Sequence, residues 1–282
     1  CIYEMMYKIL SEAKVSYIKW DMNRSITECY SAALPADRQG EVFHRYILGV
    51  YDLYDRLTTA FPQILFESCA SGGGRFDPGM LYYAPQGWIS DDTDAAERVR
   101  IQYGTSMCYP ISSMGSHVSV VPNHQLNRIT SLHTRANVAY FGTFGYELDL
   151  NKLTDEEIAE VKAQIIFMKE YRELIQFGNF YRLKSPFDGN ETVWMTVSED
   201  KRKALVFWYR ERNVVNAEFT RVRLQGLDPD LIYKNEYNGT ENYGDELMNL
   251  GLLTTDVTAG EPTNEDLPCT DYESRIYVLT AE

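Results

Sequence analysis

Two short segments in the first third of the chain end in carboxylates and could do acid–base chemistry. They are Lys19–Arg24 (KWDMNR) and Trp88–Asp94 (WISDDTD). Each is an aromatic or β-branched run that stops abruptly at an aspartate, which predicts an Asp at the C-terminal tip of a strand. In a parallel α/β barrel, such tips project side chains into the active-site mouth. Two acidic residues from different strands of one barrel are the minimum equipment for cleaving a glycosidic bond.

The first segment pairs a base with an acid. Lys19 and Asp21 are two residues apart, so both side chains point to the same side of a strand. A lysine beside an aspartate stabilises its ionised form, which a carboxylate nucleophile needs. The alternative is that Asp21 only caps the turn after the strand.

The second segment crowds three carboxylates into four residues, namely Asp91, Asp92 and Asp94. Like charges this close are expected to raise the pKa of at least one of them. A general acid must hold its proton near neutral pH, so this segment is the candidate proton donor. The alternative is that Asp92 or Thr93 caps the helix that follows.

A glycine-rich loop, residues 66–75 (FESCASGGGR), lies between the two segments. Its glycines allow a ligand to approach the backbone closely. A phosphate loop is disfavoured, because no helix start with Lys-Ser or Lys-Thr follows. We interpret Cys69 as a small residue that lines the wall of the pocket, since no pattern of His and Asn partners supports a nucleophilic cysteine. Glu67 competes for the acid–base role, or else binds substrate or pairs with an arginine.

Other chemistries and partners find little support. His117, His124 and His133 lack metal-ligand spacing, so we expect no metal and no cofactor. The net charge of −14 argues against nucleic acid and an anionic membrane as partners. The five scattered cysteines, including Cys269, are typical of reduced thiols in a cytoplasmic protein.

The elements that must position these residues alternate along the first 180 residues. Hydrophobic spacing predicts strands at 15–21, 64–67, 86–90, within 109–118 and at 138–143, and helices at 41–60, 95–103, 122–136 and from Thr154. This alternation implies parallel pairing. A full (β/α)8 barrel has eight strands in typically about 250 residues. We therefore expect either a smaller α/β sheet or a barrel whose first three units are absent.

The pattern changes after about Tyr181. Strand-like runs separated by turn signals follow, at 192–197, 204–210, 221–224, 231–236 and 274–279, with no convincing helix. We predict two domains, an α/β domain over 1–180 and a small antiparallel β domain over 181–282.

These motifs together identify a resemblance to the α-galactosidases of glycoside hydrolase family 36. Tyr17–Arg24 resembles the family's nucleophile segment, Glu67–Met80 its glycine-rich substrate loop and Trp88–Ala95 its acid/base segment. Further matches follow in the expected order at 102–106, 115–119, 224–229 and 247–252. The resemblance thus covers essentially the whole chain.

The resemblance implies a partial (β/α)8 TIM barrel, about strands four to eight, followed by an antiparallel β-sandwich. It implies a retaining hydrolase with Asp21 as nucleophile and Asp91 as acid/base, acting on raffinose- or melibiose-type α-galactosides. The full-length protein would be a homo-oligomer. Motif matching places six further residues: Lys19, Asn23, Cys69, Gly72 and Trp88 in the galactose subsite, and Arg98 in support of the acid/base segment.

The sequence departs from the family at its N-terminal end. The family's N-terminal β domain and first three barrel strands have no counterpart here, and Cys1 already lies in a helical pattern. We therefore predict a C-terminal fragment that is inactive or nearly so alone. Alternatives are an α-N-acetylgalactosaminidase, which the Cys69 loop disfavours, a non-catalytic sugar-binding derivative, and an aldolase- or isomerase-type barrel with Lys19 as a Schiff-base amine.

Overall fold

A computed structural model describes residues 1–23, 27–214, 219–254 and 271–281 of the chain. Two residues named above, Arg24 of the segment Lys19–Arg24 and Cys269, lie outside these ranges. The chain divides into two compact units, residues 1–91 and 92–282.

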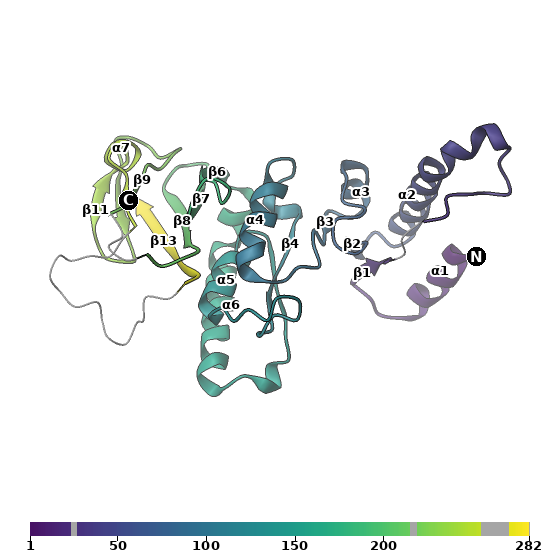
Figure 1. Cartoon of the computed structure of the whole chain (residues 1–282), viewed down its shortest axis with the longest axis horizontal. Coiled ribbons are helices and arrows are strands. Elements are labelled where there is room, and N and C mark those ends of the chain that lie inside the picture. Colours follow the sequence, from purple (N-terminus) through teal and green to yellow (C-terminus); the bar gives the residue numbers. More distant parts are fainter. Residues whose placement is uncertain (24–26, 215–218, 255–270, 282) are drawn as a thin grey trace. The chain divides into compact units, whose positions relative to one another are not determined.

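The first unit is a three-stranded sheet with three helices (Figure 1). The strands pair in parallel in the order β1-β2-β3. The elements are α1 (Ile2–Glu12), β1 (Tyr17–Asp21), α2 (Val42–Ala60), β2 (Leu65–Cys69), α3 (Pro78–Tyr83) and β3 (Gln86–Gly87). The helix between β1 and β2 supplies the crossover that parallel neighbours need.

Alternate residues of β1 have different surroundings. Ile18 and Trp20 pack against the apolar core of this unit, whereas Lys19 and Asp21 remain exposed. The Trp20 ring lies 4.8 Å from the ring of Tyr54 on α2, measured between centroids. The strand is therefore held by its apolar residues, which leaves the alternate positions available for chemistry.

The second unit begins with a second parallel α/β region. Strands β4 (Gly115–Ser119) and β5 (Thr143–Glu147) pair in parallel. Three helices accompany them, α4 (Ala95–Ser106), α5 (Leu132–Ala139) and α6 (Asp155–Phe177). The helix predicted from Thr154 is confirmed, and a capping box begins it, since the Thr154 and Glu157 side chains accept hydrogen bonds from each other's backbone N–H groups.

Two sequence-based predictions in this region are wrong. The helix predicted over 122–136 begins only at Leu132, because the Asn123 side chain accepts from the backbone of Gln125 and Leu126 and makes a turn instead. The strand predicted over 138–143 begins only at Thr143, because α5 extends through Ala139 and so includes residues where the strand was expected.

The rest of the second unit is a six-stranded antiparallel sheet, in the order β11-β10-β13-β8-β7-β6. Its strands are β6 (Asn179–Lys184), β7 (Glu191–Val197), β8 (Lys203–Arg210), β10 (Ile232–Asn235), β11 (Glu241–Tyr243) and β13 (Glu273–Ala281). A short pair, β9 (Arg221–Val222) and β12 (Leu252–Leu253), lies outside it. The antiparallel pairing predicted for this stretch is confirmed.

One short helix, α7 (Gly244–Asn249), interrupts this stretch where none was predicted. The Glu246 carboxylate accepts from the backbone N–H of Tyr243 and so stabilises the first turn. Across the described ranges, no helix combines the length and apolar character needed to cross a bilayer.

Candidate active site

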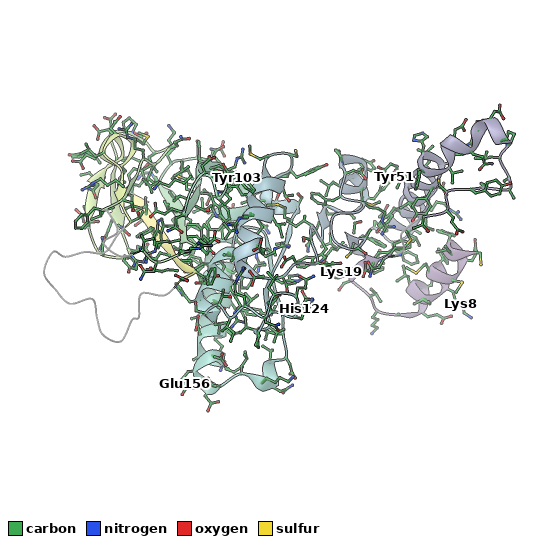
Figure 2. The ribbon with its side chains drawn as sticks, viewed as in Figure 1. Lys8, Lys19, Tyr51, Tyr103, His124 and Glu156 are labelled. Atoms are coloured by element: carbon green, nitrogen blue, oxygen red, sulfur yellow. The ribbon has the colours of Figure 1, made fainter. Side chains whose placement is uncertain are left out.

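The polar face of strands β1 and β2 gathers most of the sequence-predicted site residues. In the parallel register Lys19 stands opposite Glu67, and Asp21 stands opposite Cys69. Register partners in parallel strands point to the same face of the sheet. We call this face the polar ladder and define it by Tyr17, Lys19 and Asp21 on β1 and by Glu67 and Cys69 on β2. Figure 2 labels Lys19.

Asp21 ends β1 with an exposed carboxylate. Its Oδ2 accepts a hydrogen bond of 2.7 Å from the Asn23 side-chain amide. Partial burial acts to raise the pKa of Asp21, but hydrogen bonds from Cys69 and Asn23 and the charge of Lys19 together lower it below its usual range. Asp21 is therefore an ionised carboxylate at neutral pH, as nucleophilic attack requires.

Cys69 supplies one of these hydrogen bonds. The residue is only 3% exposed. Burial, followed by the hydrogen bond to Asp21, raises the pKa of its thiol to about 11. A thiol that stays protonated at neutral pH donates to the carboxylate and is a poor nucleophile.

Asn23 connects Asp21 to the glycine-rich loop. Its Oδ1 accepts from the backbone N–H of Ser71 at 2.8 Å, while its amide donates to Asp21. The next residue, Gly72, has φ of +74°, and a Cβ there would lie 2.6 Å from Ser90 Cα and 2.9 Å from Asp91 N. Only glycine fits this conformation so close to another backbone. The loop thus links the first motif to the second.

Trp88 makes a second link between the two motifs. Its indole N–H donates to Asp91 Oδ1 at 3.1 Å, and the Lys19 ammonium lies 4.6 Å from the ring centroid. Strand β3 ends at Gly87, so Asp91 lies beyond the strand and not at its tip as predicted. One backbone bond, from Trp88 N to Ser68 O at 2.9 Å, extends the attachment to β2. The indole contact then orients the Asp91 carboxyl group.

The neighbouring carboxylates, Asp92 and Asp94, make structural hydrogen bonds in the second unit. Asp94 caps α4, where its side chain accepts from the backbone N–H groups of Ala96 and Glu97, and it pairs with Arg128. Asp92 accepts from the backbone of Asp94. The cap is therefore Asp94, and not Asp92 or Thr93 as the sequence suggested.

Arg98 lies on α4 and is 2% exposed. Its guanidinium donates to the carbonyl of Gly115 on β4 at 2.6 Å. Burial lowers the pKa of Arg98 to about 10, although the charges of Asp92 and Glu147 oppose this shift. Arg98 is thus a buried cation at neutral pH that joins α4 to β4.

Sequence reasoning missed Tyr17 and gave Glu67 the wrong partner. Glu67 accepts from the Tyr17 hydroxyl and lies 3.5 Å from the Lys19 ammonium, so it pairs with a lysine rather than an arginine. The alternation of Tyr17, Lys19 and Asp21 along one strand was the available signal. Among the residues that the structure describes, no group of three or more His, Cys, Asp or Glu side chains is placed to hold a metal ion.

Comparison with known families gives two matches. Residues 1–178 match the family model described as Melibiase. Residues 191–279 match the Glycosyl hydrolase family 36 C-terminal domain.

Individual relatives are named alpha-galactosidases. This chain is 55% identical to alpha-galactosidase AgaA of Geobacillus stearothermophilus over 251 residues. The match covers 89% of this chain and 34% of that protein. Over the same length this chain is 52% identical to alpha-galactosidase Mel36A of Lactobacillus acidophilus and again covers 34% of it. A crystal structure of an AgaA variant in complex with raffinose matches 100% of this chain with a TM-score of 0.92 at 50% identity, and the match covers 38% of that chain. The chain thus spans about a third of the length of these relatives.

Proposed function

The chain belongs to glycoside hydrolase family 36, and from that premise we propose that it carries the catalytic pair of a retaining α-galactosidase. One observation carries the proposal. Asp21 is held as an ionised carboxylate, and Trp88 contacts both the Lys19 ammonium beside it and the Asp91 carboxyl group. Both candidate catalytic groups therefore belong to one connected set of side chains.

The two carboxyl groups have different roles in the proposed reaction. Asp21 attacks the anomeric carbon and forms a covalent galactosyl-enzyme as the glycosidic bond breaks. Asp91 protonates the departing oxygen and then takes a proton from the water that releases galactose. Retaining enzymes of this kind hold their carboxyl groups about 5–5.5 Å apart.

The proposed galactose subsite consists of the residues around this pair. Its residues are Lys19, Asn23, Cys69, Gly72 and Trp88, while Arg98 supports the acid/base segment. The proposed substrates are raffinose- or melibiose-type oligosaccharides. The raffinose complex of the AgaA variant supports this substrate class, because that relative shares half its aligned residues with this chain.

The proposed architecture is a partial (β/α)8 barrel over 1–180, with a C-terminal β-sandwich over 181–282. The five strands β1 to β5 would be barrel strands four to eight, and their parallel pairings support this assignment. The ranges matched by the two family models also support a boundary near residue 180. A homo-oligomeric state and a cytoplasmic location remain predictions.

The nucleophile assignment is tested in the protein encoded by the longest reading frame that contains these 282 residues, called the complete protein below. Asp21→Gly should lower the turnover of 4-nitrophenyl α-galactoside by about 10⁴-fold or more. Added azide should restore product as galactosyl azide, because it enters the space of the missing carboxylate.

Asp149→Asn is the matched control, since it removes a carboxylate that caps a 3₁₀ turn, and its turnover should equal that of the wild type. Normal hydrolysis by Asp21→Gly would refute the assignment. The 282-residue chain alone should show little or no turnover, and robust hydrolysis by it would contradict the predicted dependence on further barrel strands.

A further inference from the structure

Glu67 is a buried carboxylate that the proposed reaction does not use. It lies in the middle of β2, with Lys19 of β1 and Gln86 of β3 as register partners, and it is 2% exposed. Burial of a carboxylate is strongly unfavourable unless hydrogen bonds and opposite charge compensate it. Its partners therefore indicate what it does.

Each oxygen of Glu67 has its own partner. Oε2 accepts from the Tyr17 hydroxyl, which lies two residues before Lys19 on the same face. Oε1 has no hydrogen-bond donor among the described residues, and the Lys19 ammonium lies 3.5 Å from it. Tyr17 thus fixes the carboxylate from one side, and its other oxygen faces Lys19.

Lys19 is confined by this arrangement although its side chain is 36% exposed. Its ammonium has Glu67 on one side and the ring of Trp88, 4.6 Å from the centroid, on another. Its charge also acts on Asp21. A lysine side chain has four flexible carbons, so without such contacts its ammonium would sample many positions.

We propose that Glu67 is a positioning residue, which holds the Lys19 ammonium over Trp88 and toward Asp21 so that it can bind the sugar. The inference rests on the proposed function, because it takes Lys19 as a substrate-binding group. Glu67 itself is too enclosed to contact a leaving group. Its role is therefore exerted through Lys19.

A double-mutant cycle in the complete protein tests this dependence. Glu67→Gln keeps the size of the side chain and an oxygen for Tyr17 but removes the charge, and should lower kcat/KM for 4-nitrophenyl α-galactoside by about 10- to 100-fold. In a Lys19→Met background the same change should alter kcat/KM by less than about twofold, because no ammonium remains to be positioned. Equal losses in both backgrounds would overturn the proposal.

Two further variants keep the cycle interpretable. Glu41→Gln removes an exposed carboxylate that pairs with Arg38 and Arg45, and should leave kcat/KM unchanged. Tyr17→Phe removes one hydroxyl and should repeat the Glu67→Gln pattern with a smaller loss. If Glu67→Gln does not fold by far-UV circular dichroism, the Tyr17→Phe cycle decides, and additive losses there overturn the proposal.

A readout independent of catalysis separates the two proposals. Inactivity of the wild-type complete protein would refute the proposed function but would leave the positioning of Lys19 testable. The rate at which acetic anhydride modifies Lys19, followed by mass spectrometry, should rise by about threefold or more in Glu67→Gln, since Lys19 then loses its ion pair with Glu67 and its side chain is less confined. An unchanged rate would overturn the positioning role.

Discussion

Strands β1 and β8 show two different uses of a β-strand in one chain. Alternate residues of β1 are exposed, and these are polar, whereas every residue of β8 after Lys203 is buried. Strand β7 resembles β8, with residues buried throughout from Thr192. Strand β1 has one face for packing and one for chemistry, while β7 and β8 use both faces for packing.

The difference separates residues that stabilise the fold from residues that perform chemistry. Trp194 on β7 and Phe207 on β8 stack with ring centroids 4.5 Å apart, and the Phe141 ring packs edge-on to Trp194. Lys19 and Asp21 instead interact by charge and hydrogen bonds on an accessible face. We therefore expect substitutions in β7 to change stability and substitutions in the polar ladder to change activity.

The largest expected effect is on stability, from Trp194→Ala. The side chain is fully buried, so its removal leaves a cavity and should lower the free energy of unfolding by about 3–5 kcal/mol. Urea unfolding of the complete protein, followed by far-UV circular dichroism, measures the loss. Asp21→Asn is the matched change in the polar ladder and should alter stability by less than about 1 kcal/mol, because its carboxylate is exposed. Equal losses from the two variants would remove the distinction between the strands.

The same comparison explains which parts of the fold could be predicted from sequence. The alternation in β1 and the helix start at Thr154 follow from local chemistry, and both appear as predicted. The helix over 122–136 was overpredicted because apolar spacing continues through residues that the Asn123 side chain holds in a turn. Hydrophobic periodicity does not register such local competition for backbone hydrogen bonds.

The candidate site was predictable to a similar degree. The sequence placed Lys19 and Asp21 on one face, because a strand alternates sides with a fixed period. The Glu67–Lys19 pair depends on the register between β1 and β2, which are more than 40 residues apart, and no local pattern encodes it. Asp91 was misplaced at a strand tip because β3 ends early, at Gly87.

An intermediate effect is expected on thiol reactivity within the polar ladder. The raised pKa of Cys69, about 11, keeps its thiol protonated at about pH 8, whereas Cys108 is exposed. Iodoacetamide should therefore modify Cys69 about 100-fold more slowly than Cys108, measured by peptide mass spectrometry. Asp21→Asn removes the negative charge that helps to raise the pKa and should speed modification of Cys69. Equal rates at the two cysteines would show that the polar ladder is open to solvent at its Cys69 end.

The smallest expected effect concerns the acid dependence of stability. The pKa of Asp21 is lowered in the folded chain, so its charge contributes stability above the pKa of the unfolded chain, about 3.9. That contribution is lost as pH falls through the lower folded value. Asp21→Asn should thus lower the free energy of unfolding at about pH 7 by less than about 1 kcal/mol, because the exposed carboxylate is screened by solvent.

The urea midpoints of the wild type and of Asp21→Asn should converge as the pH falls through the lowered folded pKa of Asp21, below which both side chains are neutral. A constant difference across this range would mean that Asp21 stabilises the fold by shape rather than by charge. Asp21 would then contribute to stability by packing, as the residues of β7 do. If the difference between the urea midpoints instead disappears as the pH falls, Asp21 acts through its charge. An ionised carboxylate on an accessible face is what a nucleophile at this position requires.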